Sequence, residues 1–268
     1  MEELAGKMNI EEAKDLASRT IQISELKNEK NIMLYPFCST SKGIRRESIK
    51  YSSPDGKVYI EVTANHEYGM AKIWDFDILR FVFSKIDTIA IRTGHHPSTV
   101  SFSAYECLKF LNKNPNAGKN VLWLKGALDR LASTTYKGNI YRNDMKLVSG
   151  FTLIKYDYVD SESLIDKIQI TLDERLVDSL RTSTALMNIS SKLLEEPSGL
   201  KKRLIELVSL KTREQDTWVV AVPELKQLCA NTWSDVRFKC EIKKITDLDW
   251  YIQEKLISGN KNLVFTKK

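Results

Sequence analysis

Residues 47–83 read ESIKYSSPDGKVYIEVTANHEYGMAKIWDFDILRFVF, and this stretch contains two different periodicities. In its first half, apolar and polar residues alternate on both sides of the turn Pro54-Asp55-Gly56. An Asp-Gly turn between two alternating runs predicts a β-hairpin, because glycine readily adopts the positive φ angle that such a turn needs. The expected strands carry Ile49 and Tyr51 before the turn, and Val58, Ile60 and Val62 after it.

The second half of the stretch has the periodicity of an α-helix. Its apolar residues are spaced at i, i+3, i+4 and i+7 and therefore share one helix face: Leu79, Val82, Phe83 and Ile86. Asp75 lies at the expected N-cap, where a carboxylate accepts hydrogen bonds from free backbone N–H groups. We expect an amphipathic helix over about residues 75–90, directly after the hairpin.

The run YSSPDGKVYIEVTANHEYGMAKIWDFDIL at residues 51–79 closely resembles the plasmid replication initiator protein A family. Members of that family carry Y-x-S-P-D-G-K, followed by V-T-A-N-x-x-Y-G-M-A-T-I-W-D-x-D-I-L. This chain has Lys72 where a threonine is expected, which we interpret as a surface change. The resemblance covers roughly residues 35–265 and is strongest in the first third of the chain.

The resemblance implies a replication initiator that binds repeated sites in the double-stranded DNA of a plasmid origin. It further implies that the protein promotes origin opening and loading of the host helicase, with the host replication initiator as a second partner. Initiators of related architecture form homodimers that repress their own synthesis and monomers that start replication, so a homodimer is among the implied forms.

Composition is compatible with this assignment. The chain has 268 residues, enough for about two domains, and its 42% hydrophobic content is enough for packed cores. A net charge of +6 suits nucleic-acid binding where the basic residues cluster. We expect a bacterial cytoplasmic protein without membrane contact, because no apolar run has the length of a membrane span and the N-terminus is not a signal peptide. Four cysteines without a CxxC pair are typical of reduced thiols: Cys38, Cys107, Cys229 and Cys240.

The order of predicted elements is that of a winged-helix domain. A short extended piece at 100–102 follows the first helix, and the capping box Ser103-Ala104-Tyr105-Glu106 opens a helix that ends near residue 112. After a short polar turn, as a helix-turn-helix requires, a third helix is expected over about 119–132. Two β-rich runs at 139–142 and 146–158 would form the wing.

The same order returns in the last third of the chain, with helices starting near Leu200, Pro223 and Ser234 and a hairpin over about 250–266. We therefore predict an α+β fold of two tandem winged-helix domains, each a helix-turn-helix with a β-hairpin wing. The predicted division is a flexible or weakly helical segment at 1–30, a first domain at 31–160, a connection at 161–197 and a second domain at 198–268.

The DNA-binding candidates lie on the two predicted recognition helices and their wings. Lysine and arginine reach phosphates or guanine edges, and asparagine can bind adenine through two hydrogen bonds. The first domain offers Lys119, Asn120, Trp123, Arg130, Lys137 and Arg142, and the second offers Arg237, Lys239, Lys243, Lys244 and Lys261. The alternative is that these side chains form solvated, lysine-rich helix surfaces, with Trp123 in the core.

The sequence favours neither catalysis nor a cofactor. His95 and His96 are adjacent, so on a strand they would point to opposite faces, whereas a nicking nuclease needs both on one face. Asp75 and Asp77 fit helix-start residues better than an acid–base pair, and no phosphate-binding loop of the P-loop type is present. Two alternatives stay open: a winged-helix transcriptional repressor, and a rolling-circle nicking enzyme with a tyrosine nucleophile.

Overall fold

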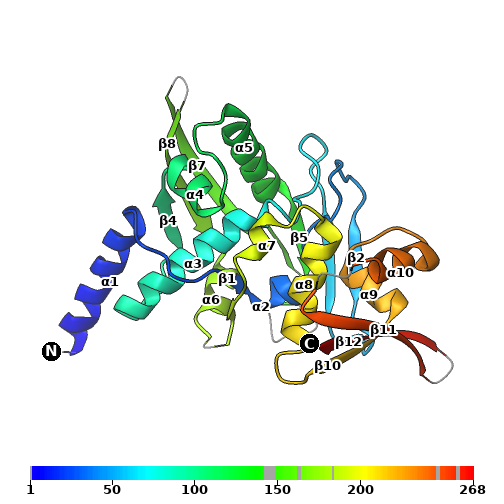
Figure 1. Ribbon diagram of the computed structural model, residues 1–268. Coiled ribbons are helices and arrows are strands. Elements are labelled where there is room, and N and C mark those ends of the chain that lie inside the picture. The colour runs from blue at the N-terminus through cyan, green and yellow to red at the C-terminus, as the bar shows by residue number, and fades with distance from the viewer. Residues whose placement is uncertain (1, 142–148, 162–163, 183, 246–247, 258–259) are drawn as a thin grey trace.

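The computed structural model describes residues 2–141, 149–161, 164–182, 184–245, 248–257 and 260–268, and it has an α+β fold (Figure 1). Two sets of elements follow the same order of helix, strand, helix, helix and two strands. The first set comprises α3 (Phe76–Thr93), β4 (Thr99–Phe102), α4 (Ala104–Phe110), α5 (Gly118–Ser133), β7 (Ile154–Ser161) and β8 (Leu164–Leu172). The second comprises α8 (Gly199–Lys211), β10 (Thr217–Ala221), α9 (Val222–Leu228), α10 (Asp235–Lys243), β11 (Trp250–Ile257) and β12 (Asn260–Lys267).

The two sets also share one sheet topology. In the first, β8 pairs antiparallel with both β4 and β7, which gives the strand order β4-β8-β7. In the second, β12 pairs antiparallel with both β10 and β11, which gives the order β10-β12-β11. Each sheet therefore places its first strand beside its last, and the final two strands form a hairpin. The α+β class predicted from the sequence is confirmed.

The hairpin predicted around residues 54–56 is present. Strands β2 (Ile49–Ser52) and β3 (Tyr59–Thr63) pair from Ser52 opposite Tyr59 to Ile49 opposite Val62. Gly56 has the positive φ angle of 70° that the turn requires. This hairpin extends into a four-stranded sheet of order β2-β3-β5-β6, completed by β5 (Thr135–Gly138) and β6 (Ser149–Phe151).

Helix α3 is the central element of the core. The four apolar residues that predicted it, Leu79, Val82, Phe83 and Ile86, are fully buried. Two charged residues of the same helix are buried as well, and both form ion pairs with α8. Asp77 accepts a hydrogen bond from the Lys202 ammonium at 2.7 Å, and Arg80 forms an ion pair with Glu206. The first helices of the two sets are therefore held together by buried, charge-assisted hydrogen bonds.

The N-terminal residues are more ordered than we expected for 1–30. Helix α1 (Glu2–Ser18) packs against α3 and β4, with Ala13 and Ala17 buried one turn apart. Strand β1 (Lys27–Glu29) pairs with β9 (Leu186–Asn188), so the segment closes a sheet with a distant part of the chain. The weakly helical character expected for residues 1–30 agrees with α1, and the pairing of β1 with β9 is a long-range contact that local pattern does not indicate. Three short helices complete the fold: α2 (Lys30–Leu34), α6 (Glu174–Leu180) and α7 (Lys192–Glu195).

The first wing was misplaced by the sequence pattern. The run at 146–158 contains parts of two strands in different sheets, β6 and β7, and the chain passes between the sheets at Thr152 and Leu153. The hairpin of the first set is β7 with β8, so residues 164–172, which we had assigned to a connection, belong to its sheet. None of the described helices has the length and apolar character needed to cross a membrane.

Candidate nucleic-acid interface

Helices α4 and α5 are joined by a short polar turn, and side-chain hydrogen bonds form near the starts of both helices. The Ser103 hydroxyl caps α4 by accepting from the Glu106 backbone N–H at 3.0 Å, as the capping box predicts. The Asn120 side-chain amide donates to the carbonyl of Asn114 at 2.8 Å. Asn120 is therefore half-buried against the turn, and its amide nitrogen is used within the protein.

Helix α5 buries one face and presents another to solvent. Leu124, Leu128 and Leu131 are fully buried, while Lys119 and Leu122 are exposed near the start of the helix. Trp123 is half-buried and lies beneath the ammonium of Lys113, 4.6 Å from the ring centroid. The turn and the helix thus share a cation–π contact that stiffens their junction.

The first hairpin lies against the same helix. The Lys125 ammonium is 5.5 Å from the ring centroid of Tyr158 on β7, and Tyr158 stacks with Tyr156 at 5.9 Å. The Tyr156 hydroxyl donates to Asp129 of α5. Figure 1 shows the β7–β8 hairpin and α5 together at the top of the molecule, so α5 and this hairpin form one continuous surface.

Arg130 does not belong to this exposed surface. Its guanidinium donates to the Asp75 carboxylate through Nε at 2.7 Å and through the Nη2 nitrogen at 2.8 Å. Asp75 is fully buried, and it accepts a third bond from the Lys72 backbone N–H instead of capping α3. Burial raises the pKa of Asp75, while Arg130 acts in the opposite direction. Arg130 thus fastens α5 to the start of α3.

Helix α10 begins at a side-chain cap, as its sequence predicted. The Ser234 hydroxyl accepts from the Arg237 backbone N–H at 3.3 Å, and Phe238 and Ile242 are fully buried. The Arg237 guanidinium lies 4.5 Å from the ring centroid of Trp233. The solvent face is formed by Val236, Arg237, Cys240, Lys243 and Lys244.

Several basic side chains of this face already have acidic partners. Glu254 of β11 accepts from Lys239 at 2.8 Å and also from Lys243, and these two bonds lower its pKa to about 2. Lys244 donates to Glu241 at 2.7 Å, one helical turn away. Any phosphate contact by these lysines would therefore replace or share an existing ion pair.

The remaining predicted residues lie elsewhere. Lys137 is on β5, opposite Glu61 of β3, so it belongs to the four-stranded sheet and not to the first wing. Lys261 is exposed on β12, in the second hairpin. Arg142 lies outside the residues that the structure describes. His95 and His96 follow Gly94 in the loop after α3, and no metal-holding group of three His, Cys, Asp or Glu side chains occurs in the described ranges.

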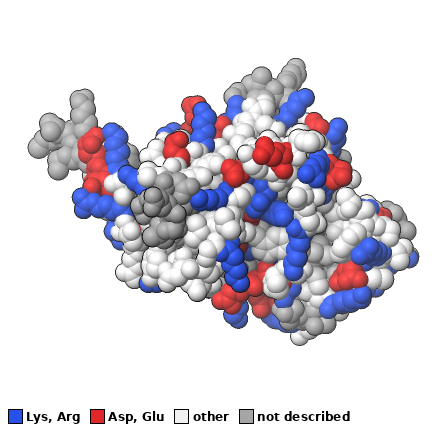
Figure 2. All heavy atoms as spheres, turned by 90° about the horizontal axis from the view of Figure 1, so that it is seen from above, with Lys and Arg blue, Asp and Glu red and all other residues white. Residues whose placement is uncertain are grey.

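Sequence reasoning missed some basic residues that accompany α5. Lys155 and Lys167 are exposed on β7 and β8, and Lys113 lies over Trp123 in the turn. A signal for Lys167 is present in the sequence, because apolar and polar residues alternate over 167–172, which is typical of a strand. Figure 2 shows basic and acidic side chains interspersed on the upper face, so charge alone does not mark out a single patch.

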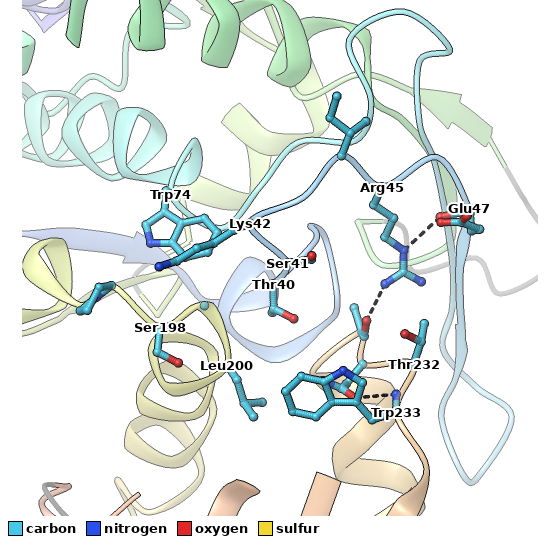
Figure 3. A pocket seen from close by; sticks show the side chains of 15 residues that line it. Thr40, Ser41, Lys42, Arg45, Glu47, Trp74, Ser198, Leu200, Thr232 and Trp233 are labelled. Carbon is cyan, nitrogen blue, oxygen red and sulfur yellow. Dashed lines mark hydrogen bonds between the residues drawn. The ribbon is translucent and has the colours of Figure 1, made fainter. Parts of the chain in front are cut away.

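A cavity of about 540 Å³ lies between the loop at 40–47 and the turn that precedes α10 (Figure 3). Thr40 donates to the Cys229 carbonyl at 3.1 Å, and Arg45 donates to the carbonyls of Ala230 and Glu47. Trp74 and Trp233 lie on different sides of this space. The loop thus supports the turn before α10 from the first half of the chain.

The family model described as replication initiator protein A matches residues 27–250. The chain belongs to the replication initiator protein A family. The match extends well beyond the run at 51–79 and includes α5, α10 and the strands of the first set. A search of curated proteins found no match to this chain.

A solved structure shares the fold at low sequence identity. Domains 2 and 3 of RctB, in a crystal structure of their selenomethionine derivatives, align with a TM-score of 0.56 at 13% identity, covering 85% of this chain and 92% of that one. A second structure of RctB domains 2–3 aligns with a TM-score of 0.49 at 12% identity, covering 88% and 95%. The first alignment indicates a shared fold over 85% of this chain.

Proposed function

We propose that the two sets of elements are winged-helix modules, with α5 and α10 as their recognition helices. The repeated order of helix, strand, helix, helix and hairpin supports this, as does the shared position of the first strand beside the last. In such modules the recognition helix enters the major groove, and its N-terminal residues contact base edges. The β7–β8 and β11–β12 hairpins are the wings. The first module then runs from α3 to β8 and the second from α8 to β12.

The protein contacts DNA through the exposed starts of the two helices and through the wings. The side chains proposed for phosphate or base contact are Lys113, Lys119, Lys155 and Lys167 in the first module, and Arg237, Lys239, Lys243, Lys244 and Lys261 in the second. Trp123 and Asn120 shape the turn that positions α5. Arg130 and Lys137 are left out, because one is engaged by Asp75 and the other lies in a different sheet.

The function that this arrangement supports best is that of a plasmid replication initiator. Two modules on one face of a duplex bind origin repeats, with their recognition helices about one DNA turn, or roughly 34 Å, apart. Binding energy and any bend imposed on the DNA then help to open neighbouring A·T-rich sequence, where host helicase is loaded. The single observation that carries the proposal is the family match over residues 27–250. The mechanism uses binding alone and needs no catalytic residue or cofactor.

A replication assay tests this function directly. A cloned plasmid origin fragment is introduced into a host with and without the full chain supplied from a second plasmid, and maintenance of the origin fragment is measured. Replication only in the presence of the protein is the expected result. Promoter repression without origin maintenance would instead identify a transcriptional repressor. Nicking of supercoiled origin DNA in the presence of divalent metal would identify a nicking enzyme.

Footprinting on the same fragment supplies the complementary measurement. Protection should fall on repeated sites, with the strongest protection in two adjacent major grooves on one face of each repeat. Protection limited to a single groove per repeat would mean that only one module binds the duplex, which contradicts the two-module arrangement.

A further inference from the structure

Helices α5 and α10 can be aligned by the residues that they bury. Leu124 and Leu128 of α5 and Phe238 and Ile242 of α10 are all fully buried, and each pair is spaced four residues apart. Ala127 and Leu131 of α5 are buried at the same spacing, so two alignments of the helices are open; we take the one that pairs Leu124 with Phe238, because it matches the solvent-facing residues of the two helices as well. The alignment fixes which solvent-facing residues of the two helices correspond.

One exposed aliphatic side chain lies at the same aligned position in each helix. Leu122 and Val236 each precede the first buried residue of their pair by two positions, and they are 70% and 71% exposed. No other large hydrophobic side chain of α5 or α10 is exposed, and both helices lie wholly within the described ranges. Apolar surface left in water is unfavourable, and its burial on binding is correspondingly favourable. Its recurrence at equivalent places in both modules points to a shared ligand.

The surroundings of these two side chains are basic. Lys119 is exposed three residues before Leu122, and Arg237 is exposed directly after Val236. Arg130 is not counted, because Asp75 holds it, and Lys239, Lys243 and Lys244 are shared with acidic partners. Lone aliphatic residues in cationic helix faces differ from the core of a protein–protein interface, where charged residues are depleted. They suit a polyanion that also offers an isolated apolar group.

The major groove of DNA supplies such a group. The 5-methyl of thymine is the apolar contact point on the base-pair edges there, and aliphatic and small side chains are its usual partners. We propose that Leu122 and Val236 each contact a thymine 5-methyl, so that each module selects thymine at one position of its site. This inference rests on the proposed function and adds a specificity-determining residue to each recognition helix.

Replacement of thymine by uracil removes only the methyl group and therefore tests the contact. A duplex is first selected from a random pool with the full chain, and each thymine is then replaced singly by uracil. The wild-type protein should bind about three- to fivefold more weakly when uracil occupies one particular position per module, the size expected for one methyl group removed from water. Replacement at the other thymines should leave affinity unchanged.

Double-mutant cycles link each methyl to its side chain. Val236→Ala should lose discrimination between thymine and uracil at one position, and Leu122→Ala at the other, so that each variant and its base change have non-additive effects. Ile91→Ala is the matched control, since Ile91 is an aliphatic residue of α3 with 77% exposure and lies on neither recognition helix. The control should discriminate as the wild type does.

The outcomes distinguish a failure of the thymine-methyl contacts from a failure of the proposed DNA binding. Site-specific binding with no effect of uracil at any position, or with discrimination unchanged in both variants, overturns the methyl contacts and leaves DNA binding intact. If the wild-type chain binds no selected duplex better than random DNA, both the methyl contacts and the proposed sequence-specific DNA binding are overturned. Loss of binding to all sequences in either variant, without a change in the thymine-to-uracil ratio, also overturns the methyl contacts.

Discussion

The guanidinium of Arg130 is bonded twice to the buried carboxylate of Asp75, at 2.7 Å and 2.8 Å, which connects α5 to the start of α3. A planar guanidinium that grips both oxygens of one carboxylate has a fixed orientation. The position of α5 relative to α3 therefore depends on this pair as well as on apolar packing. Arg130, which the sequence suggested as a DNA contact, instead forms an ion pair within the protein.

Arg130→Ala should destabilise the protein. The change leaves the buried Asp75 carboxylate without its charged partner, and breaking such a pair costs about 3 kcal/mol. The measurement is the free energy of unfolding from urea titration. Arg130→Gln with Asp75→Asn should recover part of the loss, because neither residue then carries an unpaired charge. A variant with unchanged stability and uniformly weaker DNA binding would return Arg130 to the interface.

Lys243→Ala combined with Lys244→Ala should weaken DNA binding on all sequences and reduce its salt dependence. Each phosphate contact contributes about one unit to the slope of log affinity against log salt, so the slope should fall by about two. Lys192→Ala with Lys211→Ala is the matched control, since both residues are exposed on α7 and α8. A slope that stays at the wild-type value would exclude both lysines from phosphate contact.

Glu254→Gln should tighten DNA binding. The change frees Lys239 and Lys243 from the carboxylate that both contact, and so leaves two ammonium groups available to phosphates. We expect higher affinity together with a steeper salt dependence, measured by fluorescence anisotropy over a range of salt concentrations. Weaker binding in the variant would mean that Glu254 positions the two lysines for DNA.

The same carboxylate predicts a pH effect on stability. Its pKa is lowered from the ordinary 4.5 to about 2, so its contribution is present above pH 4.5 and is lost as pH falls through about 2. Since Glu254 is only half-buried, solvent screens its ion pairs and the effect should be small. Urea midpoints of the wild type and Glu254→Gln should differ at pH 6 and approach each other in acid. A difference that grows on acidification would contradict the lowered pKa.

Cys240 should report DNA binding by α10. It is exposed, whereas Cys38, Cys107 and Cys229 are buried, and burial raises the pKa of Cys38 and of Cys229 to about 12. A maleimide should therefore modify Cys240 first in the native protein, as shown by peptide mass mapping. Specific duplex should slow this reaction more than random duplex does. Equal rates with and without DNA would place α10 outside the bound groove.

Local signals account for what could be predicted from the sequence. The hairpin at Gly56, the cap at Ser103 and the cap at Ser234 each depend on a few neighbouring residues, and each is present. The elements of the second module follow one another without interruption, so their order could be read directly from the chain. The positions of α5 and α10 followed from the same local patterns.

Pairings between distant residues could not be predicted in this way. Asp77 was interpreted as a helix-start residue, and nothing in the sequence indicates that it lies in the core opposite Lys202. Thr152 and Leu153 separate two strands of different sheets in a run that looks continuous. Lys239 and Lys243 read as free cations until Glu254 is placed beside them by the fold of β11. In each case the structure depends on residues outside the local run: Lys202 for Asp77, the two separate sheets for Thr152 and Leu153, and Glu254 for the two lysines.

The buried ion pairs between α3 and α8 have a consequence for the spacing of DNA sites. Modules joined through Asp77–Lys202 and Arg80–Glu206 do not swing independently as they would on a loose tether. Under the proposed function, inserting half a helical turn of DNA between two half-sites would carry one of them to the opposite side of the duplex, beyond the reach of a rigid pair. The tolerance of half-site spacing would then be set in the protein interior, far from any base.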